Sequence, residues 1–408
     1  MTNRSGKQFS FQIVNNQSSK IRELVESEMR GAILKTIYAL FTQEVEQLCG
    51  SPFARKGEEL CHRAGSDPGS VLAAGQRVAI KKPRVKKNGS EYELESYQAL
   101  RDYDVLSDRI KNHMLAGVST RDYDLLLEEM SNGLGLKKSA VSEAFVKSSK
   151  GALDEVNGRD LSAMKICSIM VDGIGFGDRT VIAAMGVTDK GKKKILGLRE
   201  GDSENWELCR DLFENLVARG LDATLPYLFV IDGAKALKKA IRKVFGERAP
   251  VQRCIRHKER NVLSYLPEER HIEFRRRWKL VHGCADYVVA KREYDSLLHW
   301  LSQVNHASAE SLREAELETL TVIKLGLSGL LRKTFLSTNP LESAFSLVQP
   351  KVARVKNWRS GADQIVRWAA ATLLEAESRV HSIRGHKEVP ILLAALQQFT
   401  LAEEKKLA

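Results

Sequence analysis

Two acidic residues directly follow short apolar segments, and a third lies far downstream near the start of a predicted helix. The apolar segments, residues 166–171 and 227–231, run into Asp-Gly pairs at Asp172 and Asp232, and the third acid is Glu342. Apolar runs of this length, bounded by turn residues, are typical of buried strands in mixed α/β sheets. Open sheets place active sites past the carboxyl ends of such strands. Three carboxylates gathered there could hold two divalent cations for phosphodiester chemistry.

Each of these acids also has a structural interpretation. Asp-Gly pairs are common in turns after strands. Asn339 could cap a helix in which Glu342 closes a capping box. Three other acids compete for the third position: Glu204, Glu207 and Glu214.

The glycines that follow Asp172 resemble half of a dinucleotide-binding fingerprint, with Gly173, Gly175 and Gly177 at alternate positions. That fingerprint requires a helix immediately afterwards. The residues from Arg179 onward are β-branched and strand-like instead. The sequence therefore argues against a nucleotide-binding loop.

Cys254 and His257 form a Cys-x-x-His pair, which is half of a zinc site. No convincing second pair follows, although His282 and Cys284 are candidates. Four basic residues surround the pair and could hold substrate phosphates close to bound cations: Arg253, Arg256, Lys258 and Arg260.

The elements that must position these residues follow the order βββαβαβ. After the strand before Asp172, residues 179–187 and 193–198 are predicted to be antiparallel partners. A helix over 205–219, the strand before Asp232, a basic helix over 234–245 and a short strand near Val251 complete the order. This is the order of a ribonuclease-H-like fold and differs from repeated βαβ units.

Helical patterns surround the third acid. Residues 261–334 are helix-rich and contain Trp278 and Trp300, which predicts an all-helical insertion before Glu342. A helix over 364–380 is the last one predicted.

The region upstream of the core begins with helical spacing over residues 18–48 and continues through a Gly/Pro/Ser-rich interval to a basic, β-like segment over 77–87. The segment is either a contact to a phosphate backbone or a solvated linker. Its basic residues are Lys81, Lys82, Arg84, Lys86 and Lys87.

Residues 120–150 have the pattern of a helix-turn-helix, with helices over 120–130 and 137–150 around a glycine turn at 133–136. An ordinary pair of packed helices has the same pattern. As a recognition helix, the second one would offer polar residues to a major groove: Lys137, Lys138, Ser139, Ser142 and Lys147.

The composition favours a polyanionic partner. The chain has 408 residues, and 64 Lys and Arg against 52 Asp and Glu give a net charge of +12. Nucleic acid is the leading candidate, because Lys and Arg displace counterions from phosphates. The scattered cysteines argue against a secreted disulfide scaffold. No apolar stretch approaches 18 residues, so we expect a cytoplasmic, DNA-associated protein without membrane contact.

Four stretches resemble the Mutator-type transposases of prokaryotic insertion sequences. They are residues 171–173, 230–234, 251–262 and 338–343, and the likeness extends from about residue 100 to residue 379. The resemblance implies a ribonuclease-H-like core in which Asp172, Asp232 and Glu342 bind two Mg²⁺ (or Mn²⁺) ions. It also implies that Cys254 and His257 support the active site, because the family carries this pair after its second acid.

The same resemblance implies double-stranded DNA as partner, at element ends and at the target, with the protein acting as a homodimer or higher oligomer on DNA. Two rival functions remain open. A metal-dependent nuclease of the same fold would cut DNA without joining it. A helix-turn-helix regulator would bind DNA without chemistry.

The expected architecture is α/β, with a ribonuclease-H-like mixed sheet core interrupted by an all-helical insertion. A mainly helical N-terminal DNA-binding region containing the helix-turn-helix precedes the core. The expected boundaries are 1–90 for the helical and basic region, 91–160 for the helix-turn-helix domain, 161–262 for the first part of the core, 263–334 for the insertion and 335–408 for the C-terminal helices.

Overall fold

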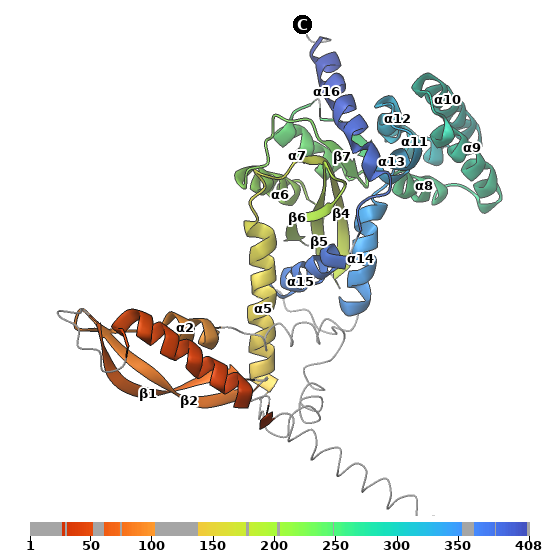
Figure 1. Cartoon of the computed structure of the whole chain (residues 1–408). Helices are drawn as coiled ribbons and strands as arrows, with labels where there is room; N and C mark the ends of the chain where they lie inside the picture. Colours follow the sequence, from red (N-terminus) through yellow and green to blue (C-terminus); the bar gives the residue numbers. More distant parts are fainter. Residues whose placement is uncertain are drawn as a thin grey trace, which may run out of the picture. The chain divides into compact units, whose positions relative to one another are not determined.

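The computed structural model divides the chain into two compact units, residues 1–145 and 146–408 (Figure 1). Each unit is described separately. The residues that the structure describes are 27–28, 31–51, 61–73, 76–102, 138–176, 179–201, 205–247, 249–352, 363–379 and 381–405. Within the described helices, no segment combines the length and the hydrophobicity needed to cross a lipid bilayer.

The first unit packs a helix over residues 31–49 on an antiparallel three-stranded sheet. The strands are β1 (Cys61–Ala73), β2 (Gln76–Lys87) and β3 (Ser90–Tyr92), followed by α2 (Glu95–Asp102). The helix buries Ile37, Phe41 and Val45, which are spaced four residues apart and therefore share one face. Against them lie the buried side chains Val71, Ile80, Val85, Leu94 and Tyr97.

The N-terminal region, expected to be mainly helical, also contains a sheet, because β1 runs through the Gly/Pro/Ser-rich interval. β1 pairs with β2 from Cys61 opposite Lys87 to Ala73 opposite Gln76. A shift in register between Arg63 and Ser66 accommodates Gly65, whose φ of 87° is unfavourable for other residues. β1 is an edge strand, where Pro68 is tolerated since no further strand needs its missing N–H.

The basic β-like segment is confirmed as β2. The first helix and the turn of the expected helix-turn-helix lie outside the described residues. The second helix is α5 (Lys138–Gly158), which continues beyond the predicted end at residue 150.

The second unit contains a mixed sheet whose strands follow the predicted chain order. They are β4 (Ile166–Phe176), β5 (Arg179–Thr188), β6 (Lys193–Gly201), β7 (Leu228–Ile231) and β8 (Val251–Arg253). In space the order is β6-β5-β4-β7-β8. The first three strands pair antiparallel, whereas β7 pairs parallel to β4 and to β8.

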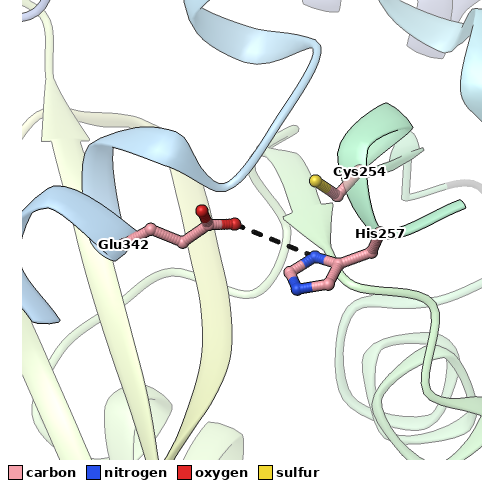
Figure 2. A group of neighbouring side chains, drawn as sticks. All are labelled: Cys254, His257 and Glu342. Atoms are coloured by element: carbon pink, nitrogen blue, oxygen red, sulfur yellow. Dashed lines mark ion pairs between the residues drawn. The ribbon is translucent and has the colours of Figure 1, made fainter. Parts of the chain in front are cut away.

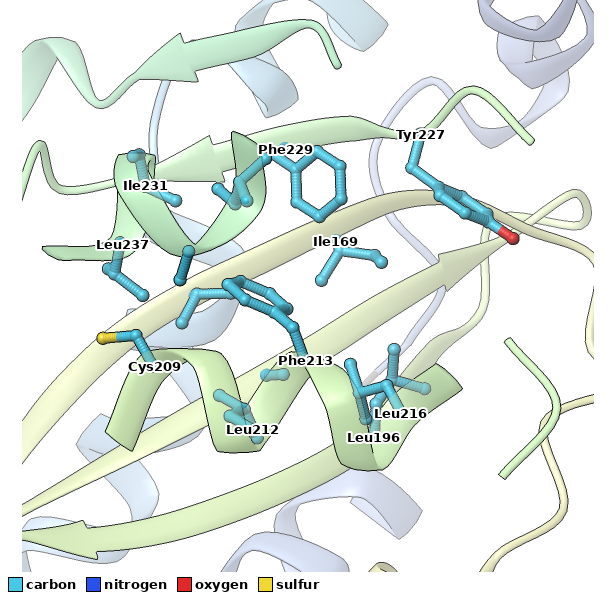
Figure 3. Packing of buried hydrophobic residues seen from close by; sticks show 14 of the residues in the cluster. Ile169, Leu196, Cys209, Leu212, Phe213, Leu216, Tyr227, Phe229, Ile231 and Leu237 are labelled. Carbon is cyan, nitrogen blue, oxygen red and sulfur yellow. The ribbon is translucent and has the colours of Figure 1, made fainter. Parts of the chain in front are cut away.

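Two helices bury their apolar faces against this sheet (Figure 3). They are α6 (Trp206–Ala218) and α7 (Lys235–Phe245), and both were predicted. α6 begins where the Asn205 side chain accepts a hydrogen bond from the Leu208 N–H at 2.8 Å. Phe213 of α6 lies edge-on against Phe229 of β7, with ring centroids 5.9 Å apart.

The segment before Glu342 is helical, as predicted, and has its own apolar core. It comprises α8 (Ile255–Leu263), α9 (His271–Gly283), α10 (Tyr287–Val304), α11 (His306–Arg313), α12 (Thr321–Lys324) and α13 (Gly329–Phe335). Buried members of that core include Phe274, Trp278, Tyr294, Leu301 and Leu312. We call residues 263–334 the helical insertion.

Ion pairs of buried cations link the sheet to the helical insertion. Arg253 of β8 is only 3% exposed and reaches the buried Glu318 and the exposed Glu314, each at 3.3 Å. Lys258 of α8, only 1% exposed, reaches Glu314 at 3.0 Å, and Lys238 of α7 reaches Glu318 at 2.6 Å. These contacts join β8, α7 and α8 to one segment of the insertion.

Three C-terminal helices complete the unit: α14 (Asn339–Val352), α15 (Gln364–Arg379) and α16 (Val389–Lys405). α15 was predicted and packs on β5 and β6, while α14 packs on β4. α16 was not predicted, although Val389, Leu392 and Leu396 have helical spacing and are buried.

The ion pairs of Glu318 predict a measurable stability effect. We expect Glu318→Gln to lower the free energy of unfolding by about 1–3 kcal/mol, because buried Arg253 would keep Glu314 but lose one of its two charged partners. The measurement is urea denaturation of the full chain. Glu310→Gln is the matched control, since Glu310 pairs at the surface, where such pairs contribute about 0–1 kcal/mol. Equal midpoints for the two variants would contradict the assigned role of Glu318.

Candidate active site

The parallel pairing of β4 with β7 brings Asp172 next to Asp232. The last paired residues are Val171 and Ile231, so the two aspartates are the next residues on neighbouring strands. Neighbouring strands lie about 4.8 Å apart. Asp232 follows the end of β7, as expected. Asp172 lies inside β4 and not past its end, because β4 continues to Phe176 in its pairing with β5.

Asp172 is a buried carboxyl group, only 6% exposed. The pKa of Asp172 is raised to about 6, mainly because the group is buried and also because the charge of Asp232 is nearby. The positive charge of His257 and hydrogen bonds from Thr338 and from the Gly173 N–H oppose this rise. The Gly173 bond is 2.9 Å long.

Asp232 is held by the turn that follows it. Its Oδ1 accepts a hydrogen bond from the Ala234 N–H at 2.9 Å. Gly233 between them has a φ of 110°, and a Cβ atom there would lie 3.0 Å from the Arg253 side chain. Glycine is therefore required at this position.

Glu342 enters the site from the first turn of α14. The Glu342 N–H donates to the Thr338 carbonyl at 2.9 Å, and the Thr338 hydroxyl donates to Glu342 Oε1 at 2.8 Å. A capping box would instead direct this carboxylate to a backbone N–H. The Glu342 carboxylate faces His257 (Figure 2).

Cys254 and His257 lie directly opposite Glu342. Cys254 is fully buried, and its N–H donates to the Ile231 carbonyl at 2.7 Å. His257 follows one turn later in α8, with its Nδ1 at 3.9 Å from Glu342 Oε1 (Figure 2). The possible ligand atoms of Cys254, His257 and Glu342 all lie within 4.8 Å of one another.

Interactions with Cys254 and Asp172 favour the protonated, positively charged form of His257. The pKa of His257 is raised to about 9, mainly by a hydrogen bond with Cys254 and also by the charge of Asp172, whereas burial lowers it. Burial raises the pKa of Cys254, but hydrogen bonds from His257 and Thr338 lower it overall. His257 is therefore protonated at neutral pH and lies among a thiol and carboxylates.

His282 and Cys284, the candidates for the second half of a zinc site, do not lie with Cys254 and His257. His282 is buried in the helical insertion, where its Nδ1 lies 3.0 Å from the Trp278 carbonyl. The Cys284 thiol donates to the Leu280 carbonyl at 3.2 Å. Among the described residues, the third ligand beside Cys254 and His257 is Glu342.

The other candidates for the third acid lie elsewhere. Glu207 and Glu214 are exposed on α6, and Glu214 lies 3.5 Å from Arg210. Glu204 lies outside the described residues. The glycines after Asp172 lead from β4 into β5, so no helix follows them and the nucleotide-loop alternative is excluded.

The four basic residues around the Cys-x-x-His pair separate into two groups. Arg256 and Arg260 are exposed on one side of α8, and the side chain of Arg256 is 63% exposed. Arg253 and Lys258 point into the protein and pair with Glu314 and Glu318. The expectation that these two hold substrate phosphates is therefore corrected, because burial and pairing occupy their charges.

Basic residues expected to contact DNA also lie in the first unit and on α5. On β2, Lys82 lies 3.9 Å from Glu93, and Arg84 lies 3.3 Å from Asp67. Lys81 and Lys87 are exposed, and Lys86 is half-buried. On α5, Lys147 is exposed, whereas only the helical backbone is described at Lys138, Ser139 and Ser142. Lys137 lies outside the described residues.

Asp172 and Asp232 offer the oxygen ligands that Mg²⁺ and Mn²⁺ prefer, and Glu342 offers another from α14. Among the described residues, the side chains that lie close enough together to hold one metal ion are Cys254, His257 and Glu342, and the two aspartates are not in that group. The pKa of Asp172, raised mainly by burial and also by Asp232, would fall if a cation bound. Thr338, whose hydroxyl contacts Glu342 and which stands directly before the Asn-Pro that begins α14, was not predicted from the sequence.

Known proteins match this chain over most of its length. The family model described as Transposase, Mutator family, matches residues 5–375. The transposase of insertion sequence IS256 in transposon Tn4001 from Staphylococcus aureus is 26% identical over 309 residues, covering 72% of this chain and 77% of that protein. The transposase of IS1081 from Mycobacterium tuberculosis is 25% identical over 390 residues, covering 92% and 91%.

A third relative, the transposase of IS6120 from Mycolicibacterium smegmatis, is 33% identical over 164 residues. That match covers 38% of this chain and half of the relative. The family match extends through both units and includes all three candidate acids. The chain belongs to the Mutator family of transposases.

Proposed function

We propose that this protein cleaves DNA at the ends of an insertion sequence and joins the freed ends to target DNA, using a ribonuclease-H-like core. Asp172, Asp232 and Glu342 are the proposed ligands of two Mg²⁺ or Mn²⁺ ions. The observation that carries the proposal is the parallel β4–β7 register, which places Asp172 beside Asp232. The strand order β6-β5-β4-β7-β8, with its first three strands antiparallel, supports the proposed fold.

Glu342 belongs to the proposed site because two side chains link it to Asp172. The Thr338 hydroxyl donates a hydrogen bond to Glu342 Oε1, and interaction with Thr338 lowers the pKa of Asp172. His257 lies 3.9 Å from Glu342 and interacts electrostatically with Asp172. No other acid among the described candidates has these links.

The proposed chemistry needs positioning and charge neutralisation. Bound divalent cations would activate the attacking oxygen and stabilise the departing 3′ oxygen. The three carboxylates hold the site's geometry, and Arg256 and Arg260 on α8 are placed to bind the backbone of the DNA. Water as nucleophile gives a nick, and the freed 3′ hydroxyl as nucleophile gives joining. A covalent Tyr or Ser intermediate is not required.

DNA-end recognition is assigned to the N-terminal part of the chain. We propose that β2 supplies phosphate contacts through Lys81, Lys86 and Lys87, because the charges of Lys82 and Arg84 have acidic neighbours. Base contacts are assigned to the start of α5. The proposed partners are the element ends and target DNA, bound by a homodimer or higher oligomer.

The triad is tested by conservative substitutions in the full chain. Asp172→Asn, Asp232→Asn and Glu342→Gln should each reduce cleavage and joining by roughly 100-fold or more, since even indirect support of a metal site contributes about 10–100-fold. Binding to end DNA should persist. The assay is strand transfer with labelled ends in Mg²⁺, with EDTA abolishing the wild-type reaction.

The matched control is Glu207→Gln, which changes an exposed acid that competed for the third position. Near-wild-type strand transfer by any of the three variants would show that the assigned metal ligands are wrong. Cleavage without joining by the wild type would indicate a nuclease. Specific binding without either reaction would indicate a regulator.

For Cys254 and His257 we expect a supporting role without stoichiometric zinc. Because His257 has a pKa of about 9, its imidazole is protonated at neutral pH and a proton competes with any metal. Cys254→Ser and His257→Gln should slow cleavage while the metal content of the purified protein stays unchanged. Elemental analysis that finds one tightly bound zinc per wild-type chain would show that the pair has a different role.

The N-terminal assignment predicts a change in salt dependence. Replacing Lys81, Lys86 and Lys87 by Gln in the full chain should weaken binding to end and scrambled DNA alike. The slope of log affinity against log salt should fall by about 1 for each lost phosphate contact. The measurement is a binding titration at several salt concentrations. An unchanged slope would place the phosphate contacts elsewhere in the protein.

A further inference from the structure

Thr338 is a fully buried polar residue at the point where three elements of the site converge. It directly precedes α14, and its side chain reaches toward β4 and toward the segment after β8. Its hydroxyl lies 2.8 Å from Glu342 Oε1 and 3.6 Å from the Cys254 sulfur. Interaction with Thr338 also lowers the pKa of the nearby Asp172 carboxyl group.

A threonine hydroxyl has a single proton to donate. In the structure this proton goes to Glu342 Oε1, because the hydroxyl and this oxygen form a hydrogen bond of 2.8 Å. The Cys254 sulfur lies further from the hydroxyl, at 3.6 Å. The Thr338 hydroxyl therefore fixes the orientation of a carboxylate that the proposed function takes as a metal ligand.

We propose that the Thr338 hydroxyl is a positioning group of the metal centre, which fixes the orientation of the Glu342 carboxylate before a cation binds. The inference rests on the proposed function, because it takes Glu342 as a metal ligand. Without the hydroxyl, Glu342 Oε1 loses its 2.8 Å hydrogen bond and the carboxylate is free to rotate. The effect of Thr338 on the reaction is then exerted through cation affinity.

The backbone and the side chain of Thr338 have separable tasks. Its carbonyl accepts hydrogen bonds from the Leu341 and Glu342 N–H groups, both at 2.9 Å, and so begins α14. Valine has the same branched shape and keeps that carbonyl, so Thr338→Val removes only the hydroxyl. Thr338→Ser keeps the hydroxyl and removes the methyl group. The pair of variants isolates the proposed interaction.

A buried threonine outside the site provides a matched control. Thr372 is 1% exposed in α15, and its hydroxyl donates to the Trp368 carbonyl of the same helix at 2.7 Å. Thr372→Val therefore removes a buried hydroxyl of the same kind without touching a proposed ligand. Any general effect of this substitution on folding appears in both Val variants.

The experiment measures Mn²⁺ binding to the full chain without DNA by isothermal titration calorimetry, and thermal unfolding with and without Mn²⁺. We expect Thr338→Val to weaken Mn²⁺ binding about 10–100-fold, as for other groups that orient metal ligands. Thr338→Ser should bind within a few fold of the wild type, and Thr372→Val should bind like the wild type. The Mn²⁺ concentration for half-maximal cleavage should rise in Thr338→Val alone, with activity partly restored at high Mn²⁺.

Two results would overturn the inference while leaving the proposed function intact. One is wild-type Mn²⁺ affinity in Thr338→Val, and the other is equal weakening in Thr338→Val and Thr338→Ser. A different result overturns both: Mn²⁺ binding by the wild type that is absent, or that Asp172→Asn leaves unchanged. Loss of folded protein in Thr338→Val but not in Thr338→Ser would instead assign the hydroxyl to folding and overturn the inference.

Discussion

The parallel register between β4 and β7 is the constraint on which the rest of the site depends. It aligns Val171 with Ile231 and so makes two aspartates, distant in sequence, neighbours at one place on the sheet. The register is held by apolar side chains of both strands, which pack against α6 and α7. A shift by one residue would turn these side chains to the other face. Burial of the apolar side chains in β4 and β7 thus fixes the positions of the two aspartates.

The helical insertion interrupts the chain between the second and the third acid, so its attachment decides where α14 begins. Arg253, Lys258 and Lys238 connect the sheet layer to Glu314 and Glu318 through pairs whose cations are largely buried. Buried pairs often contribute little net stability compared with apolar residues, but they accept only one geometry. In this protein that geometry returns the chain to the sheet, where Thr338 reaches Asp172 and Glu342.

The electrostatics of the site are those of an acidic cluster with one internal cation. Because the pKa of Asp172 in the fold lies above its ordinary value, its ionisation opposes folding as the pH rises through about 6. His257, with a pKa of about 9, offsets part of this cost at neutral pH. Divalent cations would offset more of this cost. The negative charges that lower the stability of the fold would therefore also favour metal binding.

Local sequence determined the strands before Asp172 and Asp232, the helix capped by Asn205 and the helical nature of residues 263–334, because apolar periodicity and capping act over a few residues. Contacts between distant parts of the chain decided the other features. β1 is a strand despite its Gly and Pro because β2 pairs with it. Arg253 and Lys258 are interior because Glu314 and Glu318 meet them. Thr338 gains its role only where α14, β4 and the segment after β8 converge, since its acceptors come from distant parts of the chain.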